Sequence, residues 1–297
     1  MKILLLGKNG QVGWELQRSL QPLGTVIALD RAGEGGLVGD LADLAGLRRT
    51  LCDLRPDVVI NAAAYTAVDR AESEAPLARR INAEAPEVLA QCMKRMGGWL
   101  IHYSTDYVFD GSGNLPWNEE QAPAPLNTYG HTKLEGERAI QGSDCKHLIF
   151  RTSWVYAARG SNFATTILRL AAEREALAIV DDQVGAPTGA ELIADITSHC
   201  LRAVRQKAEL GGLYHLAASG EVSWHGYAGY VIDLARQSGL KLKVRDLIPI
   251  PTVEFPRPAQ RPLNSRLDCS KLRGAFGLHL PRWQTGVQRM LTETQGA

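Results

Sequence analysis

Two residues near the middle of the chain, Tyr129 and Lys133, have the spacing of a proton-donating tyrosine and a cation that activates it. On a helix, positions i and i+4 share one face about 5–6 Å apart, so we expect the Lys133 ammonium beside the Tyr129 phenol. A positive charge there favours the phenolate and lowers a pKa of about 10 toward neutrality. The pair therefore predicts a general acid or base that works at cellular pH.

A glycine-rich turn near the N-terminus gives this pair a context. The apolar run 2–6 leads into Gly7, Gly10 and Gly13, and a helical pattern follows. In such a unit the first glycine permits a tight turn, the second lets backbone N–H groups approach a pyrophosphate, and the third allows close helix packing. The spacing departs from the usual G-x-G-x-x-G, but the order of strand, turn and helix predicts a site for a nicotinamide dinucleotide.

The choice between NADH and NADPH depends on two neighbouring residues. A second apolar run, 25–29, ends in Asp30, whose carboxylate suits the free hydroxyls of the adenosine ribose. Arg31 follows directly and suits a 2′-phosphate. The sequence leaves the choice open, and we expect both cofactors to work.

Composition is typical of a soluble enzyme. The 297 residues are 45% hydrophobic and carry a net charge of +1, which allows a large core and offers no basic cluster for nucleic acid. The N-terminal apolar run is too short for a signal peptide or a membrane span. The five cysteines lack C-x-x-C spacing and indicate reduced thiols. We therefore predict a cytoplasmic protein without a nucleic-acid or membrane partner.

Further apolar runs at 58–64, 99–104 and 147–156 alternate with helical stretches, which is the rhythm of a parallel α/β sheet. Ligands bind beyond the carboxyl ends of such strands. Because side chains alternate along a strand, Ser104 and Thr105 cannot both face one site, and the residues alone do not choose between them.

The pattern divides the chain into two parts. We expect a Rossmann-like, doubly wound parallel sheet over 1–156 and a smaller, mainly substrate-binding domain over 157–297. Segments near 189–218 are candidates to return to the first domain. A proline-rich loop that carries Arg257 and Arg261 suits an anionic ligand, although such a loop also serves as a plain connection.

Several motifs then occur together: Gly7-x-x-Gly10-x-x-Gly13, Ser104-Thr105-Asp106-Tyr107-Val108-Phe109-Asp110-Gly111, Tyr129-x-x-x-Lys133, Arg151-Thr152-Ser153-Trp154-Val155-Tyr156, Gln183-x-Gly185-x-Pro187-Thr188 and Arg261-Pro262-x-x-Ser265-x-Leu267. In this combination the chain resembles the dTDP-4-dehydrorhamnose reductases, which are extended short-chain dehydrogenase/reductases, over nearly its whole length. The resemblance implies NAD(P)H-dependent reduction of the 4-keto group of dTDP-4-dehydro-6-deoxy-L-mannose to dTDP-L-rhamnose. The product would supply rhamnose to a cell-surface polysaccharide such as lipopolysaccharide O-antigen.

The resemblance also implies roles for individual residues. The catalytic set is Thr105, Tyr129 and Lys133, which chooses the threonine over Ser104. The residues expected at the cofactor are Gly7, Gly10, Gln11, Val12, Gly13, Asp30, Asp40, Leu41, Ala62, Ala63, Ala64, Tyr129 and Lys133. Those expected at the sugar nucleotide are Thr66, Val68, Thr105, Asp106, Tyr129, Trp154, Arg261 and Asn264. For Trp154 the alternative is core filling, and for Arg261 it is a solvated loop arginine.

Members of the family can form homodimers with Mg²⁺ held by glutamates at the interface. The resemblance places such ligands at Glu15, Glu191 and Glu293. Magnesium prefers oxygen ligands in octahedral geometry, which suits carboxylates from two chains. The other interpretation is solvated surface charge.

Relatives with other activities leave alternatives. A sugar-nucleotide 4,6-dehydratase typically has an Asp-Glu pair after the catalytic threonine, but here Asp106 is followed by Tyr107. A 4-epimerase of the same superfamily is not excluded by any residue. A non-catalytic, NADP-binding regulatory subunit of methionine adenosyltransferase also resembles these reductases, although the intact catalytic set argues against that role.

Overall fold

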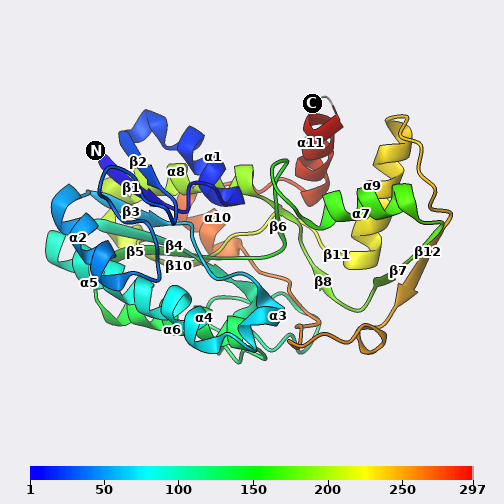
Figure 1. Ribbon diagram of the computed structural model, residues 1–297, viewed down its shortest axis with the longest axis horizontal. Helices are drawn as coiled ribbons and strands as arrows, with labels where there is room; N and C mark the ends of the chain where they lie inside the picture. Colours follow the sequence, from blue (N-terminus) through cyan, green and yellow to red (C-terminus); the bar gives the residue numbers. More distant parts are fainter. Residues whose placement is uncertain (296–297) are drawn as a thin grey trace.

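A six-stranded parallel sheet forms the centre of the computed structural model, which describes residues 1–295 (Figure 1). Its strands lie in the order β10-β5-β4-β3-β1-β2 and are parallel throughout. Their bounds are β1 (Lys2–Leu6), β2 (Thr25–Leu29), β3 (Val58–Asn61), β4 (Trp99–Thr105), β5 (Lys146–Thr152) and β10 (Gly212–His215). The predicted α/β class with a doubly wound parallel sheet is confirmed.

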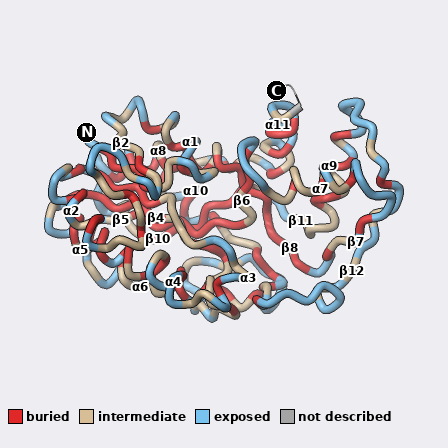
Figure 2. The backbone as a smooth tube through the Cα atoms, viewed as in Figure 1, coloured by how far each residue is buried: buried red, intermediate tan, exposed pale blue. Residues whose placement is uncertain are grey.

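The strands are apolar because both faces of this sheet are covered. Ile3 and Leu5 of β1 pack into one core, and Leu4 and Leu6 pack into the core on the opposite face. All four side chains are fully buried. Strands of parallel sheets read as continuous apolar runs for this reason. Figure 2 shows the buried backbone concentrated along these strands.

Helices form the two covering layers. On the Ile3 side they are α1 (Gln11–Ser19), α8 (Ala190–Gln206) and α10 (Ser270–Phe276). On the Leu4 side they are α2 (Leu44–Leu54), α5 (Ala85–Met96) and α6 (Thr128–Gly142). Short segments complete the layers: η1 (Gln21–Leu23), α3 (Val68–Ala71), α4 (Ala75–Arg79), η2 (Arg80–Glu84), η3 (Asp106–Val108) and η4 (Ala208–Leu210). Within residues 1–295, no helix is both long and apolar enough to cross a membrane.

The strand order reverses beside β1, which has β2 on one side and β3 on the other. The connection after β1 leads to α1 on one face of the sheet, and the connection after β3 leads toward α5 on the other. Such a reversal opens a crevice at the carboxyl ends of the strands, which is where ligands bind in open α/β sheets.

A separate hydrophobic core lies at the other end of the molecule (Figure 1). Its helices are α7 (Phe163–Glu173), α9 (Trp224–Gln237) and α11 (Trp283–Gln295). Its short strands and turns are β6 (Val155–Tyr156), β7 (Ala176–Val180), β8 (Val184–Gly185), β9 (Thr188–Gly189), β11 (Val222–Ser223), β12 (Asp246–Ile250) and η5 (Thr252–Glu254). In the sequence, α8 and β10 fall between these segments. In space, α8 packs on α1 and β10 pairs with β5. The domain boundary between residues 156 and 157 stays a prediction.

Two details differ from the sequence prediction. The expected strand at 147–156 is split into β5 and β6, because Trp154 has a φ of 46° in the left-handed region, which no strand residue adopts. Pro249, expected in a loop, lies inside β12. A proline is tolerated there because β12 pairs only with β7 in a two-stranded sheet and has an unpaired edge.

Candidate active site

The glycine turn after β1 has the shape of a dinucleotide cradle. Gly7 has a φ of 89°, and a Cβ there would lie 2.8 Å from the backbone nitrogen of Ala63. A Cβ on Gly13 would lie 2.0 Å from the Gly7 carbonyl oxygen, whereas one on Gly10 would lie 3.4 Å from the same atom. Helix α1 begins at Gln11 without a side-chain cap, so its first N–H groups suit an anion. The turn therefore fits a diphosphate above Gly10.

Asp30 lies directly after β2 and next to this turn. Its Oδ2 accepts a hydrogen bond from the side chain of Asn9 at 2.7 Å, and its Oδ1 accepts one from the Ala32 N–H at 3.0 Å. Arg31 is exposed. The carboxylate is therefore held where the chain leaves β2, while the arginine keeps its freedom to move.

The other residues expected at the cofactor differ in their burial and in the contacts that they make. Ala62, Ala63 and Ala64 form a half-buried segment directly after β3. The Leu41 side chain belongs to the core on the Leu4 side, so only its backbone is available to a ligand. Asp40 accepts a hydrogen bond from the Ala42 N–H at 2.9 Å. The Gln11 side chain donates to the Ser161 carbonyl at 3.3 Å, and Val12 packs on the core beneath α1.

The structure brings Thr105 and Tyr129 together at the carboxyl end of β4. Thr105 ends the strand, and Tyr129 lies in the first turn of α6, whose cap is the Asn127 side chain. Thr105 Oγ1 donates to Asp106 Oδ1 at 3.1 Å and accepts from the Tyr107 N–H at 3.2 Å. The Tyr107 and Tyr129 rings meet edge to face at 5.9 Å.

Burial sets the pKa of Tyr129. Burial raises this pKa to about 12, a hydrogen bond with Thr105 lowers it in part, and Asp106 adds to the rise. Among the hydrogen bonds of residues 1–295, none joins Lys133 to the phenol: its Nζ donates to the Tyr103 carbonyl at 2.6 Å and lies 3.1 Å from His102 Nε2. The predicted lowering of the Tyr129 pKa is therefore wrong for this arrangement, because the lysine is drawn to β4.

Asp106 is the second titratable group beside the tyrosine. Burial raises its pKa to about 7, and hydrogen bonds with Ser265 and Thr105 lower it in part. Its Oδ2 is buried and has no hydrogen-bond partner within the described chain. A buried, unpaired carboxyl oxygen is suited to a polar group of a ligand.

A cleft of about 1130 Å³ opens next to Tyr107. Trp224, Arg257 and Arg261 are among its lining residues. Arg261 Nη2 forms an ion pair with Asp69 Oδ1 at 2.9 Å, and its Nη1 is buried without a partner within residues 1–295. The arginine therefore keeps a donor for a ligand while the ion pair fixes its position.

The side-chain ring of Trp154 is covered on one face by another aromatic ring. It stacks on Trp224 with ring centroids 3.5 Å apart and an interplanar angle of 12°. A Cβ on Gly185 would lie 2.8 Å from the Trp154 ring, so backbone also packs tightly against it. This packing favours the core-filling interpretation, and a contact with the sugar stays a prediction.

Three further residues expected at the substrate differ in their surroundings. The Asn264 side chain is buried and donates to the Leu115 carbonyl at 2.8 Å, which gives it a structural role in its loop. Thr66 is exposed, and Val68 begins the short helix α3. Their contacts with substrate stay predictions.

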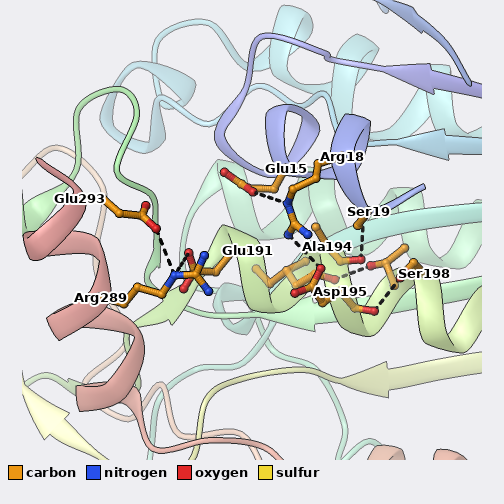
Figure 3. Close-up of polar contacts among 11 residues, drawn as sticks. Glu15, Arg18, Ser19, Glu191, Ala194, Asp195, Ser198, Arg289 and Glu293 are labelled. Carbon is orange, nitrogen blue, oxygen red and sulfur yellow. Dashed lines mark hydrogen bonds and ion pairs between the residues drawn. The ribbon is translucent and has the colours of Figure 1, made fainter. Parts of the chain in front are cut away.

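The three glutamates expected at a metal lie in one charged cluster, which Figure 3 shows at the junction of α1, α8 and α11. The cluster consists of Glu15, Arg18, Glu191, Asp195, Arg289 and Glu293. Arg18 pairs with Asp195 at 2.9 Å, and Arg289 pairs with Glu293 at 3.0 Å. Within residues 1–295, no group of three His, Cys, Asp or Glu side chains is arranged to hold a metal ion. Two arginines thus neutralise part of the acidic charge of this cluster in one chain.

Sequence reasoning missed the buried polar residues behind the site. Asn61 and His102 lie within apolar strands, and that exception to the apolar pattern was the only signal. Glu137 on α6 pairs with Arg151 on β5 at 2.6 Å, and the two side chains are 1% and 4% exposed. Their distance along the chain gave no indication of this contact.

Comparison with known proteins agrees with this geometry. The chain matches the family model described as RmlD substrate binding domain over residues 1–295. It is 55% identical over 293 residues to the dTDP-4-dehydrorhamnose reductase of Salmonella typhimurium, covering 99% of this chain and 98% of that protein. A crystal structure of the corresponding reductase from Clostridium acetobutylicum is 34% identical, with a TM-score of 0.89 and coverage of 99% and 100%. That from Bacillus anthracis, in complex with NADP, is also 34% identical, with a TM-score of 0.87 and coverage of 99% of both chains. The chain therefore belongs to the dTDP-4-dehydrorhamnose reductase family.

Proposed function

We propose that the chain reduces the 4-keto group of dTDP-4-dehydro-6-deoxy-L-mannose to give dTDP-L-rhamnose, with NADPH or NADH as the hydride donor. The observation that carries this proposal is the pair formed by buried Thr105 and half-buried Tyr129. The pair and the glycine turn both lie at the carboxyl ends of the sheet strands. Tyr129 contacts Tyr107, which lines the cleft. Two hydroxyls are thus available to one carbonyl oxygen.

The chain's own residues perform the proton chemistry. The glycine turn and Asp30 would hold a reduced nicotinamide dinucleotide, which would supply the hydride for the C4 carbonyl. Charge then develops on O4, where Thr105 donates a hydrogen bond and Tyr129 donates its proton. With its pKa raised to about 12, Tyr129 keeps this proton until the more basic alkoxide forms. Lys133 is assigned to the ribose beside the nicotinamide.

We assign the sugar nucleotide to the cleft and to the polar groups beside it. Arg261 has a buried, unpaired Nη1 and a partner, Asp69, that fixes its guanidinium. A forked and permanently charged donor suits a diphosphate. We assign the sugar-nucleotide diphosphate to Arg261 and the open carboxyl oxygen of Asp106 to a sugar hydroxyl.

The proposal is tested by mixing the protein with NADPH and a limiting amount of the keto sugar nucleotide. We expect one NADPH oxidised for each dTDP-L-rhamnose formed, measured by absorbance and by NMR of the product. An epimerase or a dehydratase would change the sugar without net NADPH consumption. A non-catalytic regulatory subunit would bind NADPH and leave the sugar unchanged. Either result contradicts the proposal.

Assembly and location form a further part of this proposal. We place the protein in the cytoplasm, where its product would serve a rhamnose-containing polysaccharide such as O-antigen. We assign Glu15, Glu191 and Glu293 to Mg²⁺ in a homodimer, because acidic groups outnumber the two arginines in this cluster. Sedimentation then detects dimers that EDTA dissociates and Mg²⁺ restores. If EDTA leaves the association state unchanged, the assignment of Mg²⁺ to these glutamates is contradicted.

A further inference from the structure

A small hairpin shortly after β2 presents the carboxylate of Glu34 to the glycine turn. Glu34 and Leu37 pair as an isolated antiparallel bridge, in which the Glu34 N–H donates at 3.1 Å and the Leu37 N–H donates at 2.9 Å. The two residues between them, Gly35 and Gly36, have φ angles of 59° and 82°. A tight two-residue hairpin turn requires positive φ at both central residues, so these glycines fix where the backbone of Glu34 lies.

The carboxylate of Glu34 is held by Lys8. Lys8 Nζ donates to Glu34 Oε2 at 3.1 Å, and the two side chains are 24% and 71% exposed. Lys8 directly follows Gly7 in the glycine turn, and its backbone N–H donates to the Leu29 carbonyl at the end of β2 at 3.1 Å. The ammonium of Lys8 is therefore part of the dinucleotide cradle, whereas its counter-charge comes from the hairpin outside the cradle.

The residue expected at the adenosine ribose lies at the same place. Asp30 follows β2, and its carboxylate accepts from the side chain of Asn9, the residue after Lys8, at 2.7 Å. An acidic side chain in this position binds the ribose hydroxyls, and the 2′-hydroxyl is the one that carries the extra phosphate of NADPH. That phosphate would meet the charged groups around Asp30, among which Lys8 and the exposed Arg31 are cations.

Glu34 already occupies one of these cations. A phosphate monoester carries about −1.5 to −2 charge at pH 7, so it attracts an ammonium more strongly than a carboxylate does. Ion pairs between exposed side chains are weak, and a bound phosphate can therefore take Lys8 from Glu34. The hairpin then keeps the freed carboxylate near the phosphate, where the two like charges repel. NADH has no 2′-phosphate and leaves the pair between Lys8 and Glu34 intact.

We propose that Glu34 is a specificity-determining residue, whose carboxylate competes with the 2′-phosphate of NADPH for Lys8 and so lowers the preference for NADPH over NADH. This inference rests on the proposed function, because it requires a reduced dinucleotide in the glycine turn. Two acidic residues then act against the phosphate in different ways. Asp30 repels it directly, and Glu34 occupies a cation that the phosphate would otherwise bind.

The test measures binding of dinucleotides in the absence of sugar nucleotide. Isothermal titration calorimetry gives the Kd of NADPH and of NADH for the wild type and for Glu34→Gln, which keeps the size of the side chain and removes its charge. We expect NADPH to bind about fivefold more tightly to Glu34→Gln, and the Kd of NADH to stay within about twofold. An unchanged ratio of the two Kd values overturns the proposal.

A double-mutant cycle separates competition for Lys8 from direct repulsion. Lys8→Met removes the ammonium and keeps an unbranched side chain, so NADPH binding should weaken about tenfold while the Kd of NADH changes by at most about twofold. In the Lys8→Met background, Glu34→Gln should improve NADPH binding by less than about twofold, because no cation is left to compete for. A full gain of about fivefold in that background would show that Glu34 acts without Lys8, which overturns the competition.

Glu135→Gln is the matched control for the loss of one negative charge. Like Glu34, Glu135 is an exposed glutamate with a cationic partner, since its carboxylate pairs with Arg79 at 2.8 Å. Its substitution should leave the Kd of both dinucleotides within about twofold. A gain in NADPH affinity as large as that of Glu34→Gln would assign the effect to net charge and would also overturn the proposal.

These measurements distinguish failure of this inference from failure of the proposed function. If wild-type protein binds neither NADPH nor NADH, the proposed reduction and the competition at Lys8 are both rejected. If both dinucleotides bind and their ratio does not respond to Glu34→Gln, only the competition at Lys8 is rejected. The reduction itself is then still decided by NADPH oxidation with the keto sugar nucleotide.

Discussion

Asp106 lies beside Tyr129, and one oxygen of its buried carboxyl group has no hydrogen-bond partner within the described chain. Burial raises its pKa to about 7, while an unfolded chain has an aspartate pKa of about 3.9. The carboxyl therefore contributes stability below about pH 4, and this contribution is lost as the pH rises through about 7. The site keeps a group whose charge weakens the fold at neutral pH.

We predict that Asp106→Asn gains stability relative to wild type as the pH rises. The asparagine keeps one carbonyl oxygen that accepts from Thr105 but carries no charge. Between about pH 4 and pH 8 the difference in free energy of unfolding should shift by up to about 4 kcal/mol in favour of the variant. Urea unfolding at both pH values measures this shift. An equal difference at the two values would show that Asp106 does not titrate on its own.

Single residues also show where sequence reasoning succeeds. Tyr129 at the start of a helix and a hydroxyl at the end of the strand 99–104 could be predicted from short stretches of chain, but only the resemblance chose Thr105 over Ser104. The contact of Lys133 with His102 could not, because it depends on the register of two strands and on how α6 lies over them. Helical spacing alone placed the lysine beside the tyrosine, and the carbonyl of Tyr103 drew it away.

At the scale of elements, the turn between β1 and α1 combines packing with binding. We predict that Gly13→Ala destabilises the fold by roughly 1–3 kcal/mol, because its Cβ would meet the Gly7 carbonyl oxygen at 2.0 Å. Gly10→Ala should change stability little, since its Cβ would lie 3.4 Å from that oxygen, but it should weaken NADPH binding about tenfold or more by intruding on the diphosphate. Thermal unfolding and fluorescence titration measure the two effects. A Gly10→Ala variant with unchanged NADPH affinity would remove the diphosphate from this turn.

Helix α6 is anchored to β5 by a buried ion pair. We predict that Glu137→Gln costs about 3–5 kcal/mol, because Arg151 is left buried without its counter-charge. The control on the same helix is Glu135→Gln, whose exposed pair with Arg79 should contribute less than about 1 kcal/mol. Urea unfolding compares the two variants. Equal losses would mean that burial does not distinguish these pairs.

Element positions were largely predictable and their interruptions were not. The apolar runs 2–6, 25–29 and 99–104 located β1, β2 and β4 within one residue. The break occurs at Trp154, whose ring stacks on Trp224, a residue far along the chain. The pairing of β12 with β7 likewise depends on the assembled second core, so a proline-rich stretch gave no sign of it.

At the scale of the whole molecule, the ion pair between Asp69 and Arg261 joins α3 to the loop after η5. We predict that Arg261→Ala raises the KM for the sugar nucleotide roughly tenfold to a hundredfold, because a charged hydrogen bond to the diphosphate is lost. NADPH affinity should stay within a fewfold. Steady-state kinetics and fluorescence titration separate the two ligands. The exposed Arg273→Ala serves as control, and equal losses for both ligands in Arg261→Ala would indicate a damaged fold.

Only part of the arrangement of the whole molecule could be predicted from the sequence. A second core forms and β10 returns to the central sheet, whereas the division into two domains stays a prediction. The grouping of Glu15, Glu191 and Glu293 rests on resemblance, since nothing in their spacing shows that α1, α8 and α11 meet. Contacts between distant helices emerge only when both cores are packed.

The central claim is that Tyr129 donates the proton that completes hydride transfer to the keto sugar. The most direct test is a single-turnover reaction, in which protein preloaded with NADPH is mixed with dTDP-4-dehydro-6-deoxy-L-mannose and NADPH absorbance is followed. Tyr129→Phe should slow this step by about 10² to 10⁴ and leave NADPH affinity within a fewfold. Tyr103→Phe, which removes a hydroxyl bound to Thr197, should react at nearly the wild-type rate. A Tyr129→Phe variant that oxidises NADPH as fast as wild type would contradict this mechanism.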